Sequence, residues 1–165
     1  LAKEFDLTYL GGGDILKEIA KEQGFQTGGD DWWDTSEGMK FLSQRSKNPE
    51  FDKKVDNKLR ELFLKGNMVL TSYTLPWLVD DGIKIWLAGT LENSARRMKT
   101  RDNMDEKEAF AIVKKRYEEN KKLYKKLYNF DFGENLSLFD KIIDTDELDA
   151  TKVLEIAKST VKEML

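Results

Sequence analysis

Short apolar segments alternate with amphipathic segments along almost the whole chain, and this alternation constrains its fold more than any other feature. The apolar segments, residues 8–10, 68–70, 83–87 and 141–143, are typical of strands. The runs 68–70 and 83–87 are typical of strands buried on both faces of a parallel sheet. Between the runs, apolar side chains recur at helical spacing in residues 14–24, 51–65, 91–99, 105–128 and 153–161. Strands that alternate with helices form βαβ units, so the sequence predicts an α/β fold with a doubly wound sheet.

The chain contains neither cysteine nor histidine among its 165 residues. This excludes cysteine nucleophiles, Ser-His triads, disulfides and zinc sites built from thiolates or imidazoles. The remaining carboxylates, amines, guanidinium groups and hydroxyls suit phosphoryl transfer, but equally a non-catalytic protein. The net charge of -3 gives no basic footprint for duplex nucleic acid, and no apolar run reaches the roughly 20 residues that span a bilayer. We therefore expect a soluble, cytoplasmic protein.

Three glycines and an aspartate, residues 11–14, separate the first predicted strand from the first predicted helix. In α/β proteins, ligands bind beyond the carboxyl ends of the strands, where such a junction lies. Glycines allow a ligand to approach the backbone, and the N-terminus of the following helix favours an anion. The same residues also suit a tight turn with Asp14 as a helix cap. The run is not a Walker A loop, because no Gly-Lys-Ser/Thr follows it.

Arginines form a second candidate anion site. Arg97 and Arg101 are four residues apart beside Arg96, so they share one face of a predicted helix, and Arg116 lies farther along the chain. Guanidinium groups bind phosphate oxygens through paired hydrogen bonds. The alternative is a solvated basic face neutralised by nearby carboxylates, namely Asp102, Asp105 and Glu106.

Residues 114–126 combine basic side chains with tyrosines. Such a pattern can bind single-stranded nucleic acid. However, Tyr117, Tyr124 and Tyr128 fall at helical spacing, where a helix contacts a core. We therefore interpret these tyrosines as core contacts and expect no nucleic-acid partner.

Further segments match a known family in their order and spacing along nearly the whole chain. They are residues 13–22, 49–52 with Asp56, 65–70, 84–87, 91–92, Arg97, Arg101, Arg116, Tyr124, Tyr128, Asp131, 136–140 and 143–145. Together they resemble the nucleoside monophosphate kinases, most closely the short cytidylate kinases of archaeal type. The resemblance implies a three-layer α/β/α P-loop nucleotide-kinase fold with a parallel sheet, a helical acceptor-binding insertion and a short lid.

The resemblance makes residues 1–165 a single kinase domain, with the insertion at about residues 25–60 and the lid at about residues 97–116. Members of the family begin with a strand, a Walker A loop and a helix that ends in a segment like residues 1–5. Roughly twenty residues of this pattern, including a central buried strand, would precede Leu1. We expect the natural protein to carry them, and residues 1–165 alone to be inactive.

The resemblance also implies roles for individual residues. The acceptor pocket would be lined by Gly12, Gly13, Asp14, Lys17, Tyr73 and Trp77. The catalytic residues, which neutralise the charge of the transferring phosphoryl group, would be Arg97, Arg101 and Arg116. Asp144 and Thr145 would lie beside the adenine of ATP. Mg²⁺ would be held mainly by the preceding loop and the phosphates, with no ligand among residues 1–165.

The implied reaction is reversible transfer of the γ-phosphoryl group of ATP to a nucleoside monophosphate, most closely CMP or dCMP. We expect ATP with Mg²⁺ and the monophosphate as partners, and a monomer or weak dimer without membrane attachment. Tyr73 and Lys17 stand where the family has arginines, and Asn120 and Leu123 replace residues that contact the base. A P-loop kinase for another small acceptor, a non-catalytic nucleotide-binding regulator and a helical interaction module are therefore alternatives.

Trp32 and Trp33 lie in a glycine-rich acidic loop, residues 26–33. A capping-box pair, Asp34 and Glu37, predicts a helix directly after it. We expect the two rings to be buried against that helix. The alternative is that one ring closes over the acceptor base, because stacking tolerates any base.

Overall fold

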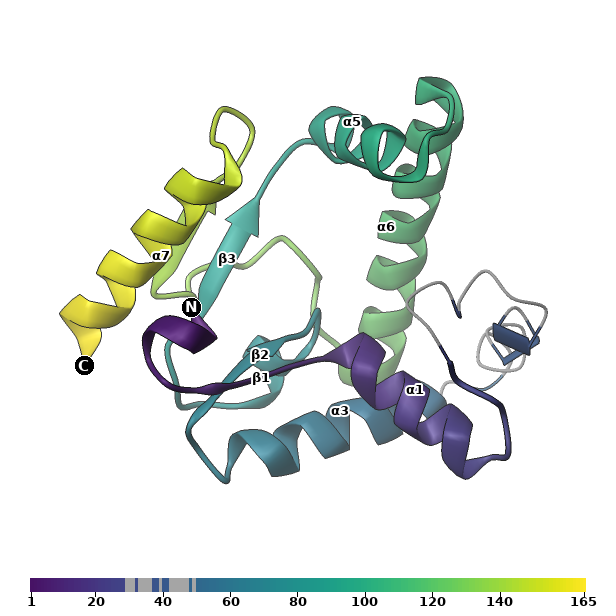
Figure 1. The fold of residues 1–165 in the computed structure, drawn as a ribbon, viewed down its shortest axis with the longest axis horizontal. Coiled ribbons are helices and arrows are strands. Elements are labelled where there is room, and N and C mark those ends of the chain that lie inside the picture. Colours follow the sequence, from purple (N-terminus) through teal and green to yellow (C-terminus); the bar gives the residue numbers. More distant parts are fainter. Residues whose placement is uncertain (29–31, 33–36, 39, 42–47, 49) are drawn as a thin grey trace. The chain divides into compact units, whose positions relative to one another are not determined.

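The computed structural model describes residues 1–28, 32, 37–38, 40–41, 48 and 50–165, and it divides into two compact units, Leu1–Asp80 and Asp81–Leu165 (Figure 1). Each unit contains a pair of parallel strands packed with helices, so the predicted α/β class with parallel strands is confirmed. No helix within the described part of the chain is long and apolar enough to cross a membrane.

The first unit is built around strands β1 (Thr8–Gly11) and β2 (Met68–Thr71), which run parallel with Gly11 opposite Thr71. A single 3₁₀ turn, η1 (Ala2–Glu4), precedes β1. The helices of this unit are α1 (Gly12–Glu22), α3 (Glu50–Phe63) and α4 (Leu75–Leu78). α1 and α3 pack against each other and against the strand pair. Their shared core contains Ile15, Val55, Leu59 and Leu75.

Local geometry accounts for the residues that begin two helices of this unit. Helix α1 begins at Gly12 rather than Asp14, because the Asp14 carboxylate accepts a hydrogen bond from the Gly11 N–H at 2.8 Å within the first turn. Pro76 lies in the first turn of α4. A proline fits there because the N–H that it lacks has no partner in a first helical turn.

A second small core in the first unit surrounds Trp32, whose side chain is 1% exposed. Its ring centroid lies 5.7 Å from that of Phe41, which two further phenylalanines contact edge-on. Burial is therefore confirmed for Trp32, and stacking of this ring on an acceptor base is wrong. Trp33 and Asp34 lie outside the described residues.

The second unit is built around the parallel strands β3 (Ile85–Ala88) and β4 (Lys141–Asp144). Its helices are α5 (Leu91–Asp102), α6 (Glu106–Tyr128) and α7 (Ala150–Met164). Side-chain oxygens cap all three N-termini, from Thr90, Asp105 and Asp149. α5 packs against α6, and α7 packs against β4.

Aromatic side chains form the core beside β3. Trp86 contacts Phe132 and Phe139 at ring-centroid distances of 5.5 and 5.2 Å. Tyr117 and Tyr124 of α6 reach the same Phe132 ring at 5.8 and 5.5 Å. The interpretation of these two tyrosines as core contacts is therefore confirmed.

The two strands predicted to be buried on both faces are only partly covered. β2 and β3 have no fully buried residue, and the Leu87 side chain is 57% exposed. In β4, Ile143 is buried but Ile142 is 48% exposed. The prediction is wrong for β2 and β3, because helices cover the faces of a parallel sheet, and the helices among the described residues leave these strands partly exposed. Apolar strand surface is therefore left open in the second unit.

Candidate active site

The carboxyl ends of β1 and β2 meet at one edge of their sheet, and the glycine run continues from this edge into α1. The closest approach is at Gly11, where a Cβ atom would lie 2.9 Å from Thr71 Oγ1. At Gly13, a Cβ atom would meet no atom of the described residues within 4 Å. Packing between the strands therefore requires glycine at position 11, whereas the backbone at Gly13 is open to a ligand.

Hydroxyl groups line the same sheet edge. The Tyr9 hydroxyl lies 3.3 Å from Thr71 Oγ1. Ser72 Oγ accepts hydrogen bonds from two backbone N–H groups that follow it, each at 3.1 Å. Thr74 Oγ1 donates to the buried carboxylate of Asp56 in α3. The loop after β2 is therefore held by hydrogen bonds to its own backbone and to α3.

The residues that the resemblance assigns to the acceptor pocket all fall in the first unit. Residues 12–14 form the first turn of α1, and Lys17 lies one turn later on the same helix. Tyr73 lies in the loop after β2 and is 63% exposed, and Trp77 follows in α4. The structure thus brings residues 12–14 and the loop after β2 to one sheet edge. It also shows Asp14 in the helix-capping role, which is the simpler interpretation of that residue.

At the carboxyl ends of β3 and β4, hydrogen bonds converge on Asp146. Its carboxylate accepts from the Thr90 N–H at 2.9 Å and from the Asn93 side-chain amide at 2.9 Å. These bonds, above all the one from the Thr90 N–H, hold the pKa of Asp146 below its ordinary value of 3.8, and the charge of Arg97 adds to the effect. Asp146 thus ties the start of α5 to the segment after β4.

The two residues predicted to lie beside adenine make local hydrogen bonds in the same segment. Thr145 is buried, and its hydroxyl donates to the Ala88 carbonyl at 2.8 Å. Asp144 accepts from the Asp146 N–H at 2.9 Å. The Thr145 carbonyl accepts from Arg97 Nη2 at 2.6 Å. One catalytic-arginine candidate and one adenine candidate are therefore in direct contact.

Arg101 forms a bidentate pair with its neighbour Asp102, with Nε and Nη2 at 2.6 and 2.7 Å from the two carboxylate oxygens. The Arg101 side chain is 69% exposed. Its hydrogen bond lowers the pKa of Asp102, and the charge of Arg116 lowers that pKa further. Arg101 and Arg116 therefore both lower the pKa of Asp102. This agrees with the alternative interpretation of the arginines, a basic surface neutralised by nearby carboxylates.

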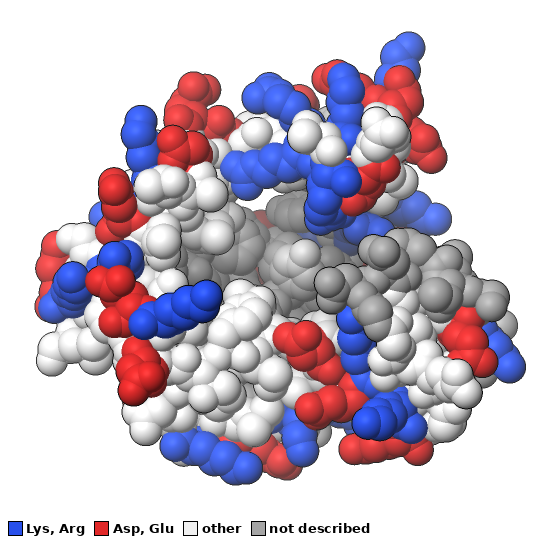
Figure 2. Space-filling view, in the orientation of Figure 1, with Lys and Arg blue, Asp and Glu red and all other residues white. Residues whose placement is uncertain are grey.

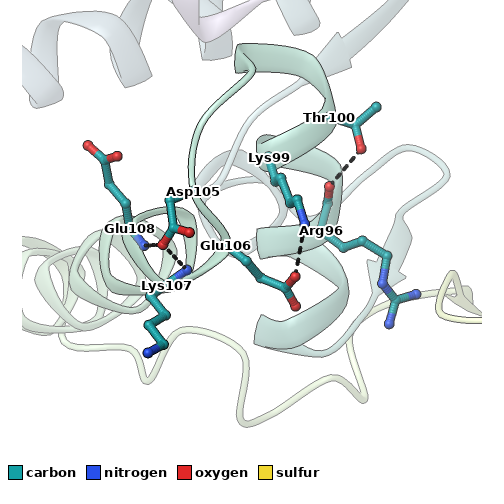
Figure 3. Close-up of polar contacts among 7 residues, drawn as sticks. All are labelled: Arg96, Lys99, Thr100, Asp105, Glu106, Lys107 and Glu108. Carbon is teal, nitrogen blue, oxygen red and sulfur yellow. Dashed lines mark hydrogen bonds and ion pairs between the residues drawn. The ribbon is translucent and has the colours of Figure 1, made fainter.

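The turn between α5 and α6 is fixed by side chains at both helix ends (Figure 3). Lys99 Nζ donates to Glu106 at 3.1 Å, and Asp105 accepts from two N–H groups at the start of α6. The Arg96 guanidinium points away from these groups. Figure 2 shows basic side chains gathered over this helix pair and interleaved with acidic ones. The predicted lid segment is thus a defined helical hairpin with cations on its surface.

Sequence reasoning missed several residues that shape these two sheet edges. Thr90 precedes an amphipathic segment, so the N-cap rule is sufficient to find it. Asn93, Asp146 and Thr71 carry no comparable local signal. Their partners are distant along the chain, since 53 residues separate Asn93 from Asp146 and 62 separate Tyr9 from Thr71.

A comparison with family models and a comparison with curated proteins agree with each other. The family model described as the cytidylate kinase-like family matches residues 1–147. The cytidylate kinase of Methanocaldococcus jannaschii is 32% identical over 98% of this chain and 86% of its own length. That of Staphylothermus marinus is 29% identical, over 100% of this chain and 88% of its own length. The crystal structure of an uncharacterized protein from Eubacterium ventriosum has a similar fold, with a TM-score of 0.67 at 15% identity over 98% of this chain and 87% of that chain.

We predict that Gly11→Ala destabilises the protein by about 1–3 kcal/mol, because the new methyl group meets Thr71 Oγ1. Thr71→Ala in the same protein should recover most of the loss by removing that oxygen. Gly13→Ala is the matched control, since it adds the same methyl group in open space. Urea unfolding of the four proteins measures the effect. Equal stability of the Gly11→Ala and Gly13→Ala variants would contradict it.

A second prediction concerns the pH dependence of stability. Because the folded protein depresses the pKa of Asp146, its stabilising effect is complete above pH 3.8 and is lost as the pH falls through the lower folded value. Asp146→Asn should therefore lower the urea midpoint at neutral pH, and the difference from wild type should shrink below pH 3.8. Glu147→Gln, at the exposed neighbouring carboxylate, is the control. A difference for Asp146→Asn that stays constant with pH would refute the assignment.

Proposed function

The chain belongs to the cytidylate kinase-like family, and from this premise we propose that it transfers the γ-phosphoryl group of ATP to CMP or dCMP. The protein is a phosphotransferase, and the products of this reaction are ADP and a nucleoside diphosphate. The observation that carries the proposal is the sheet edge at Gly11 and Thr71, where the open glycine turn and the loop after β2 meet. An edge formed by the carboxyl ends of parallel strands is where α/β proteins bind ligands.

The proposed fold is the three-layer P-loop nucleotide-kinase fold in one domain, with an acceptor insertion at about residues 25–60 and a lid at about residues 97–116. In this fold a strand and a Walker A loop precede Leu1. The half-exposed apolar side chains of Leu87 and Ile142 support a further element that covers them. The upstream sequence tests this point directly, since it should contain Gly-x-x-Gly-x-Gly-Lys-Ser/Thr. A cytoplasmic location also belongs to the proposal.

In the acceptor subsite, the phosphate of CMP would meet the backbone of Gly12 and Gly13 at the start of α1. An anion is favoured there by the N-terminal end of the helix dipole and by the Lys17 charge. Tyr73 and Trp77 would form the floor of the pocket. The acceptor phosphate is itself an anionic nucleophile, so the reaction needs alignment and charge neutralisation rather than a general base.

The arginines of the second unit would supply that neutralisation. Arg101 would have to leave Asp102 to reach a phosphate, and the cost is small because an exposed ion pair contributes little to stability. A phosphate offers two charge-assisted hydrogen bonds in return. The charge of Arg116 also lowers the pKa of Asp102, so an anion in place of that carboxylate would be attracted by both arginines. Arg97, through the Thr145 carbonyl, would link this helix to the segment that holds the adenine.

Magnesium is expected with ATP, where it would polarise the transferring phosphoryl group. Within the described part of the chain, no three carboxylates are arranged to hold a metal ion. By the resemblance, Mg²⁺ would be held mainly by a Walker A loop and the phosphates. The steps above depend on the protein's own backbone, lysine and arginines.

One observation favours a kinase for another small acceptor as a second candidate. The loop after β2 carries Thr71, Ser72 and Tyr73 in place of an arginine-containing segment, and Lys17 replaces the second arginine. Phosphate binding by arginine is bidentate, whereas lysine acts as a point charge. The loss of these arginines should reduce the preference for an acceptor that carries a phosphate. A panel of acceptors with and without a phosphate would reveal this.

We predict that the natural protein, with its own N-terminus, converts ATP and CMP or dCMP to diphosphates with a higher kcat/KM than for UMP, AMP or GMP. A coupled assay for ADP, confirmed by chromatography of both products, measures the reaction. Binding of ATP without turnover of any monophosphate would favour the second candidate or a non-catalytic regulator.

We further predict that Arg97→Ala, Arg101→Ala and Arg116→Ala each lower kcat by about 10²–10³-fold, because each removes a contact to charge that develops in the transition state. Arg96→Ala is the matched control, since it removes an exposed guanidinium from the same helix that points away from the α5–α6 contacts (Figure 3). Thermal unfolding should change little in all four proteins. Turnover close to wild type in the three test variants would leave these arginines as surface charges.

A further inference from the structure

Helix α3 buries a carboxylate beside its apolar stripe. Asp56 is only 6% exposed, next to the core residues Val55 and Leu59. A carboxylate is rarely buried without hydrogen-bond partners, because desolvation of the charge is costly. The hydroxyl of Thr74, which is itself 2% exposed, donates to this carboxylate. The acidic side chain of α3 is therefore directed at the loop after β2.

The side-chain hydrogen bonds of Ser72 and Thr74 are donated in one direction, from Ser72 to Thr74 and from Thr74 to Asp56. The Thr74 hydroxyl has a single proton, and Asp56 accepts it. The contact of 3.2 Å between Ser72 Oγ and Thr74 Oγ1 must therefore be donated by Ser72. Ser72 Oγ also accepts from the N–H groups of Thr74 and Leu75 at 3.1 Å each. One donated and two accepted bonds use the full capacity of a serine hydroxyl.

We call this series from Ser72 through Thr74 to Asp56 the hydroxyl relay. It encloses one of the two residues proposed to form the floor of the acceptor pocket. Tyr73 lies between its two hydroxyl residues and is 63% exposed. On the other side, Thr71 lies against Gly11 and beside the Tyr9 hydroxyl. The relay thus fixes the backbone that presents an exposed phenol and a threonine hydroxyl at the sheet edge.

We propose that Asp56 and Thr74 are positioning residues for the acceptor subsite, which they act on by fixing the loop that carries Tyr73. This inference rests on the proposed kinase function. Tyr73 has no charge with which to attract a phosphate, so its contribution depends on where the loop holds its ring and backbone. A preorganised loop binds more tightly because less conformational entropy is lost on binding. Loss of the relay is therefore expected to weaken acceptor binding and to leave ATP binding unchanged.

The test compares Thr74→Val with Thr74→Ser in the natural protein. Valine keeps the shape but removes the hydroxyl, whereas serine keeps the hydroxyl. Thr74→Val should raise the KM for CMP about tenfold or more, with the KM for ATP within about twofold of wild type, because the variant loses the buried hydrogen bond to Asp56 that fixes the loop. The Thr74→Ser variant, which keeps the hydroxyl, should have a KM for CMP close to the wild-type value.

Thr160→Val provides a matched control for general loss of stability. Thr160 is also buried, at 8% exposure, and its hydroxyl donates to the Ile156 carbonyl at 3.0 Å in α7. The Thr160→Val variant should leave the KM for CMP and the KM for ATP unchanged. Ser72→Ala is a second test variant at a less buried position, so it keeps the proposal testable even if Thr74→Val does not fold. It should also raise the KM for CMP selectively.

The outcomes separate this inference from the function on which it rests. Wild-type turnover with unchanged KM for CMP in Thr74→Val and Ser72→Ala overturns the inference alone. Equal increases of both KM values, or effects no different from those of Thr160→Val, also overturn it. No turnover of any monophosphate by the wild-type protein overturns the proposed function, and the inference with it.

Discussion

Parallel pairing of β1 with β2 sets the geometry on which the candidate acceptor site depends. Because parallel strands end at the same edge, Gly11 and Thr71 leave the sheet side by side, with room for only a hydrogen atom on the Gly11 Cα. This close approach allows α1 to begin at once and leaves the backbone at Gly13 open. A larger residue at position 11 would force the Thr71 side chain out of its place at the strand end.

Polar groups hold both sheet edges, but in different ways. In the first unit a buried carboxylate, Asp56, is satisfied by a hydroxyl from a neighbouring loop. In the second unit Asp146 lies nearer the surface and accepts from backbone and amide donors, which lower its pKa. A buried acceptor is costly to leave unsatisfied, so the first arrangement constrains a loop strongly. The second arrangement connects α5 to the adenine candidates through Arg97 and Thr145.

The arginines show why charge patterns need a structure for their interpretation. Their spacing on one helix suggests a common anion, yet Arg97 donates to a carbonyl and Arg101 to the adjacent carboxylate. The exposed pair with Asp102 is weak enough to exchange for a phosphate. The same geometry is therefore compatible with both the neutralised surface and the catalytic role, and kinetic data on the variants distinguish them.

The sequence by itself determined the element types, the parallel α/β class, the glycine junction and the family resemblance, because these depend on periodicity and order within short segments. The resemblance also named the acceptor candidates, and the structure then brought residues 12–14 and the loop after β2 to one sheet edge. Only the tertiary structure decided that Gly11 is required by Thr71, that Thr74 reaches Asp56 and that Arg97 contacts Thr145. These partners lie 18 to 60 residues apart along the chain, and no local pattern encodes which side chains meet when helices and strands pack. Burial was overestimated for β2 and β3 for the same reason, since apolar composition does not specify how far helices cover the faces of a sheet.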